Sequence, residues 1–153
     1  MENNWLSSKW QDNFFNIAKE VGSWSKDPSS KIGAVAVSPS RRILCTGYNG
    51  FPVGIIDTYE RLHDRDQKYK YMIHAEKNCI YNAVASGVGL KDSHLFVTGL
   101  PVCEHCALAV VQSGIKYVYM QHPSAIADKW QESFKETSKI FHEAGVNYVC
   151  YKR

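Results

Sequence analysis

Three short stretches of the sequence carry residues that could bind a metal ion. Cys103 and Cys106 are three residues apart, so at the start of a helix their sulfur atoms share a face and can reach one ion. His74, at the start of another expected helix, supplies a third ligand of a kind that zinc prefers. The positive end of each helix dipole favours thiolate over thiol. The spacing therefore predicts a zinc site formed by His74, Cys103 and Cys106.

The number of ligands indicates what the zinc does. A structural zinc is usually closed by four protein ligands, whereas a catalytic zinc keeps one position open for water. We find only three ligands, because Cys79 lies off the helix face of His74 and His105 points away from the two neighbouring cysteines. Zinc lowers the pKa of bound water to ~7, and Glu76 is placed to take the proton. The pattern predicts a hydrolytic site, and a structural zinc is the alternative.

The metal ligands and Glu76 need elements that bring them together, and the apolar pattern predicts those elements. Apolar residues recur every three or four positions between Trp10 and Trp24, which is typical of an amphipathic helix. Two β-branched runs joined by a turn at residues 38–41 predict an antiparallel hairpin. Residues 51–73 have no clean period, and we expect a long loop with a short helix there. The expected helices cover residues 10–24, 74–85, 103–113 and 126–144, and the expected strands cover residues 32–37, 43–48, 95–98, 117–120 and 148–151.

The order of these elements predicts the fold class. Glycines stand just past three of the expected helices, where a left-handed cap residue is common, at Gly87, Gly114 and Gly145. Strands that alternate with helices after a hairpin predict an α/β protein with a sheet covered on both faces and with its later strands parallel. We expect one domain over residues 1–153, with no repeat and no linker.

The composition narrows the class of protein. The 153 residues are 44% hydrophobic and 22% charged, which fits one globular domain. Five cysteines cannot all pair within one chain, and the N-terminus lacks the apolar stretch of a secretory signal, so we expect a cytoplasmic protein. No apolar run approaches the ~20 residues of a membrane span. A net charge of +3 without a Lys/Arg tract favours a small ligand over nucleic acid.

With these motifs in this order, the sequence resembles the cytidine and deoxycytidylate deaminase superfamily, and most of all its deoxycytidylate (dCMP) branch. His-x-Glu at residues 74–76 followed by Cys-x-x-Cys at residues 103–106 matches the zinc signature of deaminases that act on cytosine and adenine. The family usually has Pro directly before the first cysteine, whereas Val102 separates Pro101 from it here. The resemblance covers most of the chain, with further similar stretches at residues 24–35, 47–52, 112–115 and 143–146.

The resemblance implies a fold, a reaction and a set of ligands. The fold is the three-layer α/β/α cytidine-deaminase-like fold with a mixed five-stranded sheet. The reaction is zinc-dependent hydrolysis of dCMP to dUMP and ammonia, which supplies dUMP for thymidylate synthesis, with Glu76 as the proton carrier. Asn49 is implied as a ligand of the sugar or the base. A homohexamer with dCTP as activator and dTTP as inhibitor, together with Mg²⁺, is also implied, and the effector site would include Gly47, Tyr48, Asn49 and Gly50.

Several points stay open on the sequence alone. Residues 49–50 could be no more than a turn. The basic and aromatic residues that could bind a 5′-phosphate could equally form a solvated loop, and they are Lys26, Lys31, Arg61, Arg65, Lys68, Tyr69 and Tyr71. A deaminase of free cytidine or of adenosine in transfer RNA shares the zinc motif, and a non-enzymatic interaction domain stabilised by zinc is a third possibility. The remaining cysteines, Cys45, Cys79 and Cys150, are expected to be buried core residues rather than ligands. The tryptophans Trp5, Trp10 and Trp24 are expected in the core or at an interface of the first helix.

Overall fold

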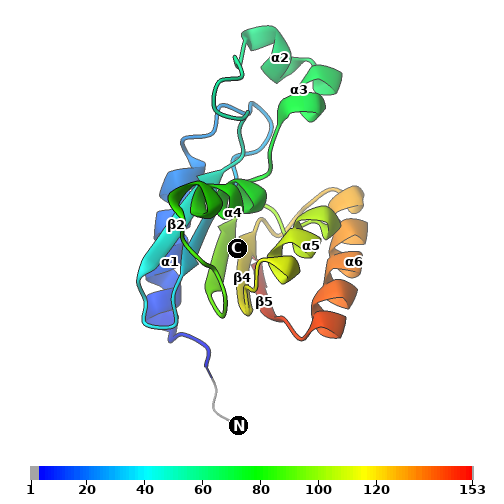
Figure 1. The fold of residues 1–153 in the computed structure, drawn as a ribbon. Coiled ribbons are helices and arrows are strands. Elements are labelled where there is room, and N and C mark those ends of the chain that lie inside the picture. Colours follow the sequence, from blue (N-terminus) through cyan, green and yellow to red (C-terminus); the bar gives the residue numbers. More distant parts are fainter. Residues whose placement is uncertain (1–3, 153) are drawn as a thin grey trace.

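The computed structural model describes residues 4–152 of the chain. Within these residues, five strands form one sheet with the order β2-β1-β3-β4-β5 (Figure 1). The strands are β1 (Gly33–Val37), β2 (Ile43–Tyr48), β3 (His94–Thr98), β4 (Tyr117–His122) and β5 (Asn147–Lys152). The helices are α1 (Ser8–Gly22), α2 (Tyr59–His63), α3 (Arg65–Tyr71), α4 (Ala75–Ser86), α5 (Glu104–Gln112) and α6 (Asp128–Ala144).

The sheet is mixed, as the order of the elements predicts. β1 runs antiparallel to both β2 and β3, and β3, β4 and β5 run parallel to one another. The hairpin pairs Val35 with Thr46 and Ala34 with Gly47. Parallel neighbours need a crossover connection, which α5 provides between β3 and β4 and α6 provides between β4 and β5. The expected α/β class and the mixed five-stranded sheet are confirmed.

Helices cover both faces of the sheet, because successive side chains of a strand point to opposite faces. Val35, Phe96 and Tyr119 share one apolar cluster with Phe14 of α1. The alternate residues of the same strands, such as Val97, belong to a larger cluster that includes α4, α5 and α6. Figure 1 accordingly shows α1 on the opposite side of the sheet from the other three helices. The three layers are therefore helix, sheet and helices.

Residues 51–73 form an arm that projects from the sheet and contains the two short helices α2 and α3 (Figure 1). The prediction of a loop with one short helix is therefore only partly correct. Each helix begins at a side-chain cap that is visible in the sequence. Thr58 Oγ1 accepts a hydrogen bond from the Arg61 backbone nitrogen at 3.2 Å, and Asp64 Oδ1 accepts one from the Gln67 backbone nitrogen at 3.1 Å. The arm also carries Lys68, whose side chain is buried.

Strand β2 packs closely on helix α4. A Cβ atom on Gly47 would lie 2.6 Å from the Ala75 carbonyl oxygen and would also collide with the backbone nitrogen of Cys79, so only glycine fits there. Asn78 and Asn82 each donate a side-chain hydrogen bond of 2.8 Å from α4 to a carbonyl oxygen of β2. This interface fixes where α4 begins, and the candidate ligand His74 directly precedes it.

The structure also settles the positions of several single residues. Trp24 follows the end of α1, is 54% exposed and meets the ring of Tyr48 edge-on, so of the two expected positions, core or interface, it does not occupy the core. Cys79 is buried as expected, whereas Cys45 and Cys150 are only partly buried. Among the helices of residues 4–152, none combines the length and the apolar character needed to cross a membrane.

Candidate active site

The three predicted metal ligands meet where α4 and α5 begin. His74 is the N-cap residue of α4, Cys103 is the N-cap residue of α5, and Cys106 lies in the first turn of α5. His74 Nδ1 lies 3.5 Å from Cys103 Sγ and 3.4 Å from Cys106 Sγ. All three ligand atoms lie within 4.8 Å of one another. The two helix starts therefore assemble one group from residues that are far apart in the sequence.

The electrostatics of this group suit a cation. Hydrogen bonds from Cys106 and then from His74 outweigh burial and lower the pKa of Cys103 to about 4. The same contact with Cys103 raises the pKa of His74 above its ordinary value. The pKa of Cys106 is raised, first because of its hydrogen bond with Cys103 and then because of burial. Cys103 is therefore the more acidic of the two thiols.

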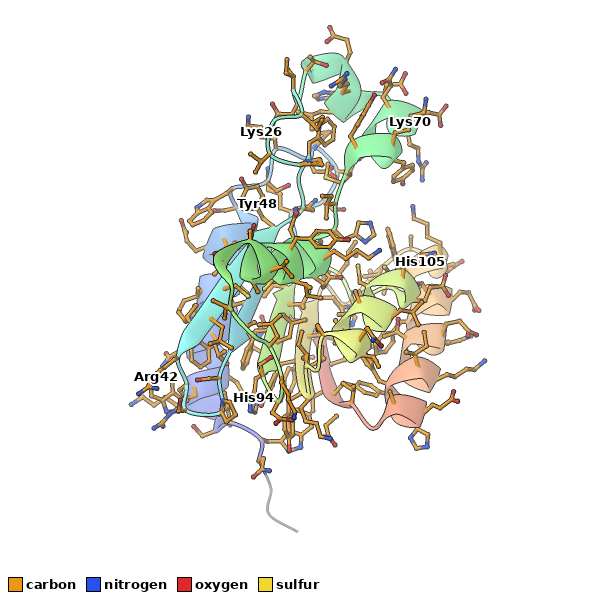
Figure 2. All side chains as sticks on the ribbon, viewed as in Figure 1. Lys26, Arg42, Tyr48, Lys70, His94 and His105 are labelled. Carbon is orange, nitrogen blue, oxygen red and sulfur yellow. The ribbon has the colours of Figure 1, made fainter. Side chains whose placement is uncertain are left out.

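The geometry of the group fits a tetrahedral zinc ion. With bonds of ~2.3 Å to sulfur and ~2.0 Å to nitrogen, tetrahedral zinc separates these two ligands by about 3.5 Å. The two nitrogen–sulfur distances are 3.5 and 3.4 Å. Within residues 4–152 the group contains three candidate ligands, His74, Cys103 and Cys106. His105 is exposed on α5 and is not one of the three residues of this group (Figure 2).

Glu76 is buried beside the metal ligands in the first turn of α4, and only 4% of its surface is exposed. Burial is the main reason why the pKa of its carboxyl group is raised above 4.5, and the charge of His74 opposes this shift. A carboxyl group with a raised pKa can both accept and return a proton near neutral pH. Glu76 is therefore suited to acid–base chemistry at this position.

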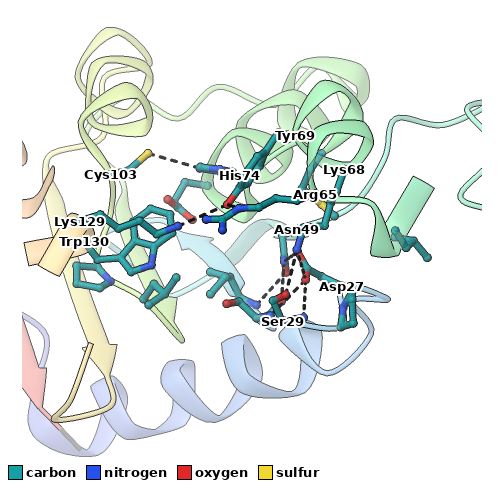
Figure 3. Close-up of a pocket in the computed structure, with 18 of the residues that line it drawn as sticks. Asp27, Ser29, Asn49, Arg65, Lys68, Tyr69, His74, Cys103, Lys129 and Trp130 are labelled. Atoms are coloured by element: carbon teal, nitrogen blue, oxygen red, sulfur yellow. Dashed lines mark hydrogen bonds and ion pairs between the residues drawn. The ribbon is translucent and has the colours of Figure 1, made fainter. Parts of the chain in front are cut away.

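A cavity of about 420 Å³ opens in front of His74, Glu76 and Cys103 (Figure 3). This volume is within the range of small-molecule sites. The wall is formed by the segment before β1, the arm, and the starts of α5 and α6. The lining residues outside the metal group are Asp27, Pro28, Ser29, Ser30, Ile32, Asn49, Leu62, His63, Arg65, Lys68, Tyr69, Met72, Leu100, Pro101, Lys129 and Trp130.

One wall of the cavity is held by a buried polar network. Lys68 Nζ contacts Asp27 Oδ1 at 3.2 Å, and the two side chains are 10% and 7% exposed. Asn49 Oδ1 accepts a hydrogen bond from the Ile32 backbone nitrogen at 2.9 Å, and Asn49 Nδ2 donates to the Ser30 carbonyl oxygen at 2.8 Å. The network fastens residues 27–32 to the arm and to the end of β2. Asn49 is thus a cavity residue whose amide already positions the neighbouring segment.

Two cations from different helices converge on a tyrosine in the cavity. Tyr69 Oη accepts hydrogen bonds from Arg65 Nε at 3.3 Å and from Lys129 Nζ at 3.5 Å, and Figure 3 shows the three side chains pointing toward one another. The hydrogen bond from Arg65 is the main reason why the pKa of Tyr69 is lowered. Within residues 4–152, neither Arg65 nor Lys129 forms an ion pair with a carboxylate. This cluster therefore leaves positive charge available to a ligand.

The structure selects among the basic and aromatic residues that the sequence left open. Arg65, Lys68 and Tyr69 line the cavity, whereas Lys26, Lys31, Arg61 and Tyr71 do not. Lys31 Nζ instead donates a hydrogen bond to the Ser25 carbonyl oxygen, so its position does not support a contact with the substrate.

The contribution of α6 to the cavity was missed from the sequence. Lys129 and Trp130 line the cavity from the first turn of α6. Lys129 meets Tyr69 across a separation of 60 residues in the chain. Helix periodicity predicts α6 itself but carries no signal for such a contact.

The turn at residues 47–50 lies beside a second, smaller cavity. Tyr48 and Gly50 line this space of about 90 Å³ together with Lys26 and Asp57, which form an ion pair at 2.9 Å. Figure 2 shows Tyr48 and Lys26 near the base of the arm. Gly47 does not line the space, because it faces α4.

Comparisons with known proteins agree with this geometry. Residues 8–122 match the family described as the cytidine and deoxycytidylate deaminase zinc-binding region. The chain is 38% identical over 142 residues to an uncharacterised deaminase of Aliivibrio fischeri, with 92% of each protein covered. It is also 34% identical over 147 residues to the deoxycytidylate deaminase of Homo sapiens. This alignment covers 92% of this chain and 78% of the human protein.

A solved structure shows the same fold. The dCMP deaminase from the cyanophage S-TIM5, in complex with dCMP and dUMP, superimposes with a TM-score of 0.75 at 22% sequence identity. The superposition covers 95% of this chain and 99% of that one. The expected cytidine-deaminase-like fold is thereby confirmed.

The metal group can be tested without an activity assay. We expect Cys106→Ser to lower bound zinc from about one ion per chain to near zero after dialysis against a weak chelator, because a hydroxyl group is a much poorer zinc ligand than a thiolate. Elemental analysis by mass spectrometry measures the metal, and Cys150→Ser on β5 is the control that should keep it. Retention of a full zinc ion by Cys106→Ser would contradict the assignment.

Proposed function

We propose that this chain, which belongs to the cytidine and deoxycytidylate deaminase family and is a hydrolytic deaminase, acts on dCMP. The reaction converts dCMP and water into dUMP and ammonia. One observation carries the choice of substrate. A single cavity combines the His74, Cys103 and Cys106 group with a cationic cluster that has no carboxylate partner among the described residues. A nucleoside monophosphate offers both a base that can reach the metal group and a phosphate anion that can bind the cationic cluster.

We propose that His74, Cys103 and Cys106 hold one zinc ion per chain. Bound there, zinc would act as a Lewis acid that lowers the pKa of water to about 7. The contribution of the chain is to present one imidazole and two sulfurs at the starts of two helices, where the dipoles favour the thiolate form. Burial of the cysteines keeps bulk water away from the ligands.

We propose Glu76 as the proton carrier of the reaction. Its carboxylate takes a proton from the attacking water and delivers it to N3 of the cytosine ring as the new C4–O bond forms. The same carboxylate then takes the remaining proton from the new C4–OH group and transfers it to the amino group, which leaves as ammonia when the C4–N bond breaks and C4=O forms. A buried carboxyl group with a raised pKa suits both directions of transfer.

We propose that Arg65, Tyr69 and Lys129 bind the 5′-phosphate. In the structure the phenol oxygen of Tyr69 accepts hydrogen bonds from both cations. A phosphate dianion is a stronger acceptor than a neutral phenol, so it would recruit the same donors. Lys68 is a weaker candidate, because Asp27 already neutralises it at 3.2 Å. Asn49 would shape the wall beside the sugar through its hold on residues 27–32.

The alternatives fit the structure less well. Free cytidine carries no anion and would leave Arg65 and Lys129 without a ligand. Adenosine in transfer RNA calls for an extended basic surface, and the net charge of +3 is not gathered into a Lys/Arg tract. A zinc-stabilised interaction domain has no need for a buried Glu76 beside the metal ligands.

We further propose that nucleoside triphosphates regulate the enzyme at the turn formed by residues 47–50, with dCTP as activator, dTTP as inhibitor and Mg²⁺ on the triphosphate. The turn is linked to the metal group by a short path. Gly50 and Ile73 exchange two backbone hydrogen bonds of 3.1 and 2.9 Å, and Ile73 directly precedes His74. Tyr48 and Gly50 also border the smaller cavity, which gives an effector a place to contact the turn.

We propose a cytoplasmic homo-oligomer, a hexamer by resemblance, in which one domain per chain supplies dUMP for thymidylate synthesis. Apolar side chains are exposed in two places that could lie between subunits. Val53 and Ile56 of the arm are 105% and 71% exposed, and Tyr81 and Val84 of α4 are 52% and 72% exposed. The five free cysteines fit a reducing compartment.

The role of Glu76 can be tested by Glu76→Gln. We expect this variant to keep its zinc and its fold but to lose at least about 10³-fold in kcat, because an amide cannot carry the proton. Ammonia release from dCMP measures turnover, and elemental analysis measures zinc. Turnover near the wild-type rate would contradict the assignment of the proton carrier.

The phosphate site predicts a change in substrate preference. We expect Arg65→Gln and Lys129→Gln each to raise the KM for dCMP by roughly 10- to 100-fold, the effect of losing one charged hydrogen bond. The kcat/KM for deoxycytidine, which lacks the phosphate, should stay within about twofold. Lys70→Gln is the control, because Lys70 is exposed on the same helix as Arg65 and does not line the cavity. An equal loss on both substrates would argue against a phosphate contact.

The proposed regulation predicts the shape of the kinetic curve. We expect sigmoidal saturation with dCMP that becomes hyperbolic with dCTP and Mg²⁺, and that shifts to higher dCMP concentrations with dTTP and Mg²⁺. Initial rates over a range of dCMP concentrations measure both effects. Rates that do not respond to either triphosphate would remove the proposal and leave the deaminase assignment in place.

A further inference from the structure

Two cysteines outside the metal group lie in contact across the interface between β2 and α4. Cys45 Sγ and Cys79 Sγ are 3.4 Å apart, although 34 residues separate them in the sequence. Cys79 is fully buried in α4, whereas Cys45 is partly exposed on β2. β2 is an edge strand of the sheet, and Cys45 is the more exposed residue of the pair.

The surrounding structure holds this pair in place. Asn78 and Asn82, the neighbours of Cys79 on α4, donate hydrogen bonds of 2.8 Å to carbonyl oxygens of β2. Gly47 allows the backbones of the two elements to touch next to the pair. A disulfide has a sulfur–sulfur bond of ~2.05 Å, so the two sulfurs, now 3.4 Å apart, must approach by about 1.4 Å to form one. Side-chain rotation and a small shift of α4 can supply such a movement.

The two thiols differ in a way that assigns their order of reaction. The hydrogen bond with Cys79 lowers the pKa of Cys45, while the same contact and burial raise the pKa of Cys79. Because its pKa is the lower of the two and it is partly exposed, Cys45 is the thiol that we expect to react first with an oxidant. The buried Cys79 is positioned to react second, with the sulfur beside it.

We propose that Cys45 and Cys79 are an oxidation site, at which a low-molecular-weight disulfide such as oxidised glutathione converts the thiol pair into an internal disulfide that slows the enzyme. The Cys45 thiolate attacks one sulfur of the oxidant, forms a mixed disulfide and releases one glutathione. Cys79 then loses its proton and attacks the Cys45 sulfur, which releases the second glutathione. Two protein thiols are oxidised, and one disulfide is reduced to two thiols.

The position of the pair connects it to the active site. Cys79 lies three residues after Glu76, so the two residues are neighbours on one face of α4. A pull on Cys79 toward β2 therefore moves the turn of helix that carries Glu76. Cys45 lies in the strand that leads into Gly47 and Asn49. The effect on turnover rests on the proposed function, whereas the disulfide itself does not.

The experiment compares reduced and oxidised zinc-loaded protein. We expect incubation with oxidised glutathione to join the tryptic peptides 43–61 and 78–91, which contain Cys45 and Cys79, in a species that mass spectrometry detects and dithiothreitol removes. The kcat for dCMP should fall at least fivefold and recover with dithiothreitol, while zinc stays at one ion per chain. Cys45→Ser should keep its kcat under the same treatment, and Cys150→Ser should respond like wild type. Cys79→Ala provides a second variant that cannot form the bond.

The outcomes separate the two proposals. Absence of the joined peptide, or a joined peptide without a fall in kcat, overturns the oxidation site. A fall in kcat that persists in Cys45→Ser also overturns it, because the oxidation then acts elsewhere. A reduced enzyme that does not deaminate dCMP at all contradicts the proposed function, and the joined peptide still decides whether the thiol pair forms a disulfide.

Discussion

The close packing of the β1–β2 hairpin between two helices is the constraint on which the active site depends. Gly33 and Gly47 lie on neighbouring strands, and neither position has room for a Cβ atom. At Gly33 the obstacle is the Ala18 carbonyl oxygen of α1, and at Gly47 it is the backbone of α4 at Ala75 and Cys79. The hairpin thus fixes the height of α4 above the sheet. Because the metal group combines one residue at the start of α4 with two at the start of α5, this height determines whether the three ligand atoms can meet.

The charges of the cavity are divided between groups that are neutralised and groups that are not. Asp27 and Lys68 cancel each other and are buried, so they hold the wall in place without attracting a ligand. Glu76 is buried without a cationic side chain bonded to it among the described residues, and desolvation favours its protonated form. Arg65 and Lys129 share only the neutral phenol of Tyr69. Of these charged groups, Arg65 and Lys129 are therefore the ones that can bind an anionic ligand.

The residues that could be predicted from the sequence are those with a local signal. Cys103 and Cys106 share a helix face through their spacing, and the alternation of strands and helices predicts the sheet. The same reasoning could not find the contact of Lys129 with Tyr69 or that of Lys68 with Asp27, which span 60 and 41 residues. Tertiary contacts of this kind leave no period in the sequence. Helices α2 and α3 are an intermediate case, because the caps that start them are visible but their apolar faces are too short to show a period.

Helix α4 receives two separate links from the hairpin, and both lie near the end that carries the proposed active-site residues. The turn at residues 47–50 reaches the helix through the backbone pair of Gly50 and Ile73, just before His74. The thiol pair reaches it at Cys79, one turn after Glu76. A displacement at the first link would move His74, the proposed metal ligand, whereas a displacement at the second would move Glu76, the proposed proton carrier. In the proposed reaction both groups act at one carbon atom of the base, so the proposed effector and the proposed oxidation would act on one reaction without competing for the same surface.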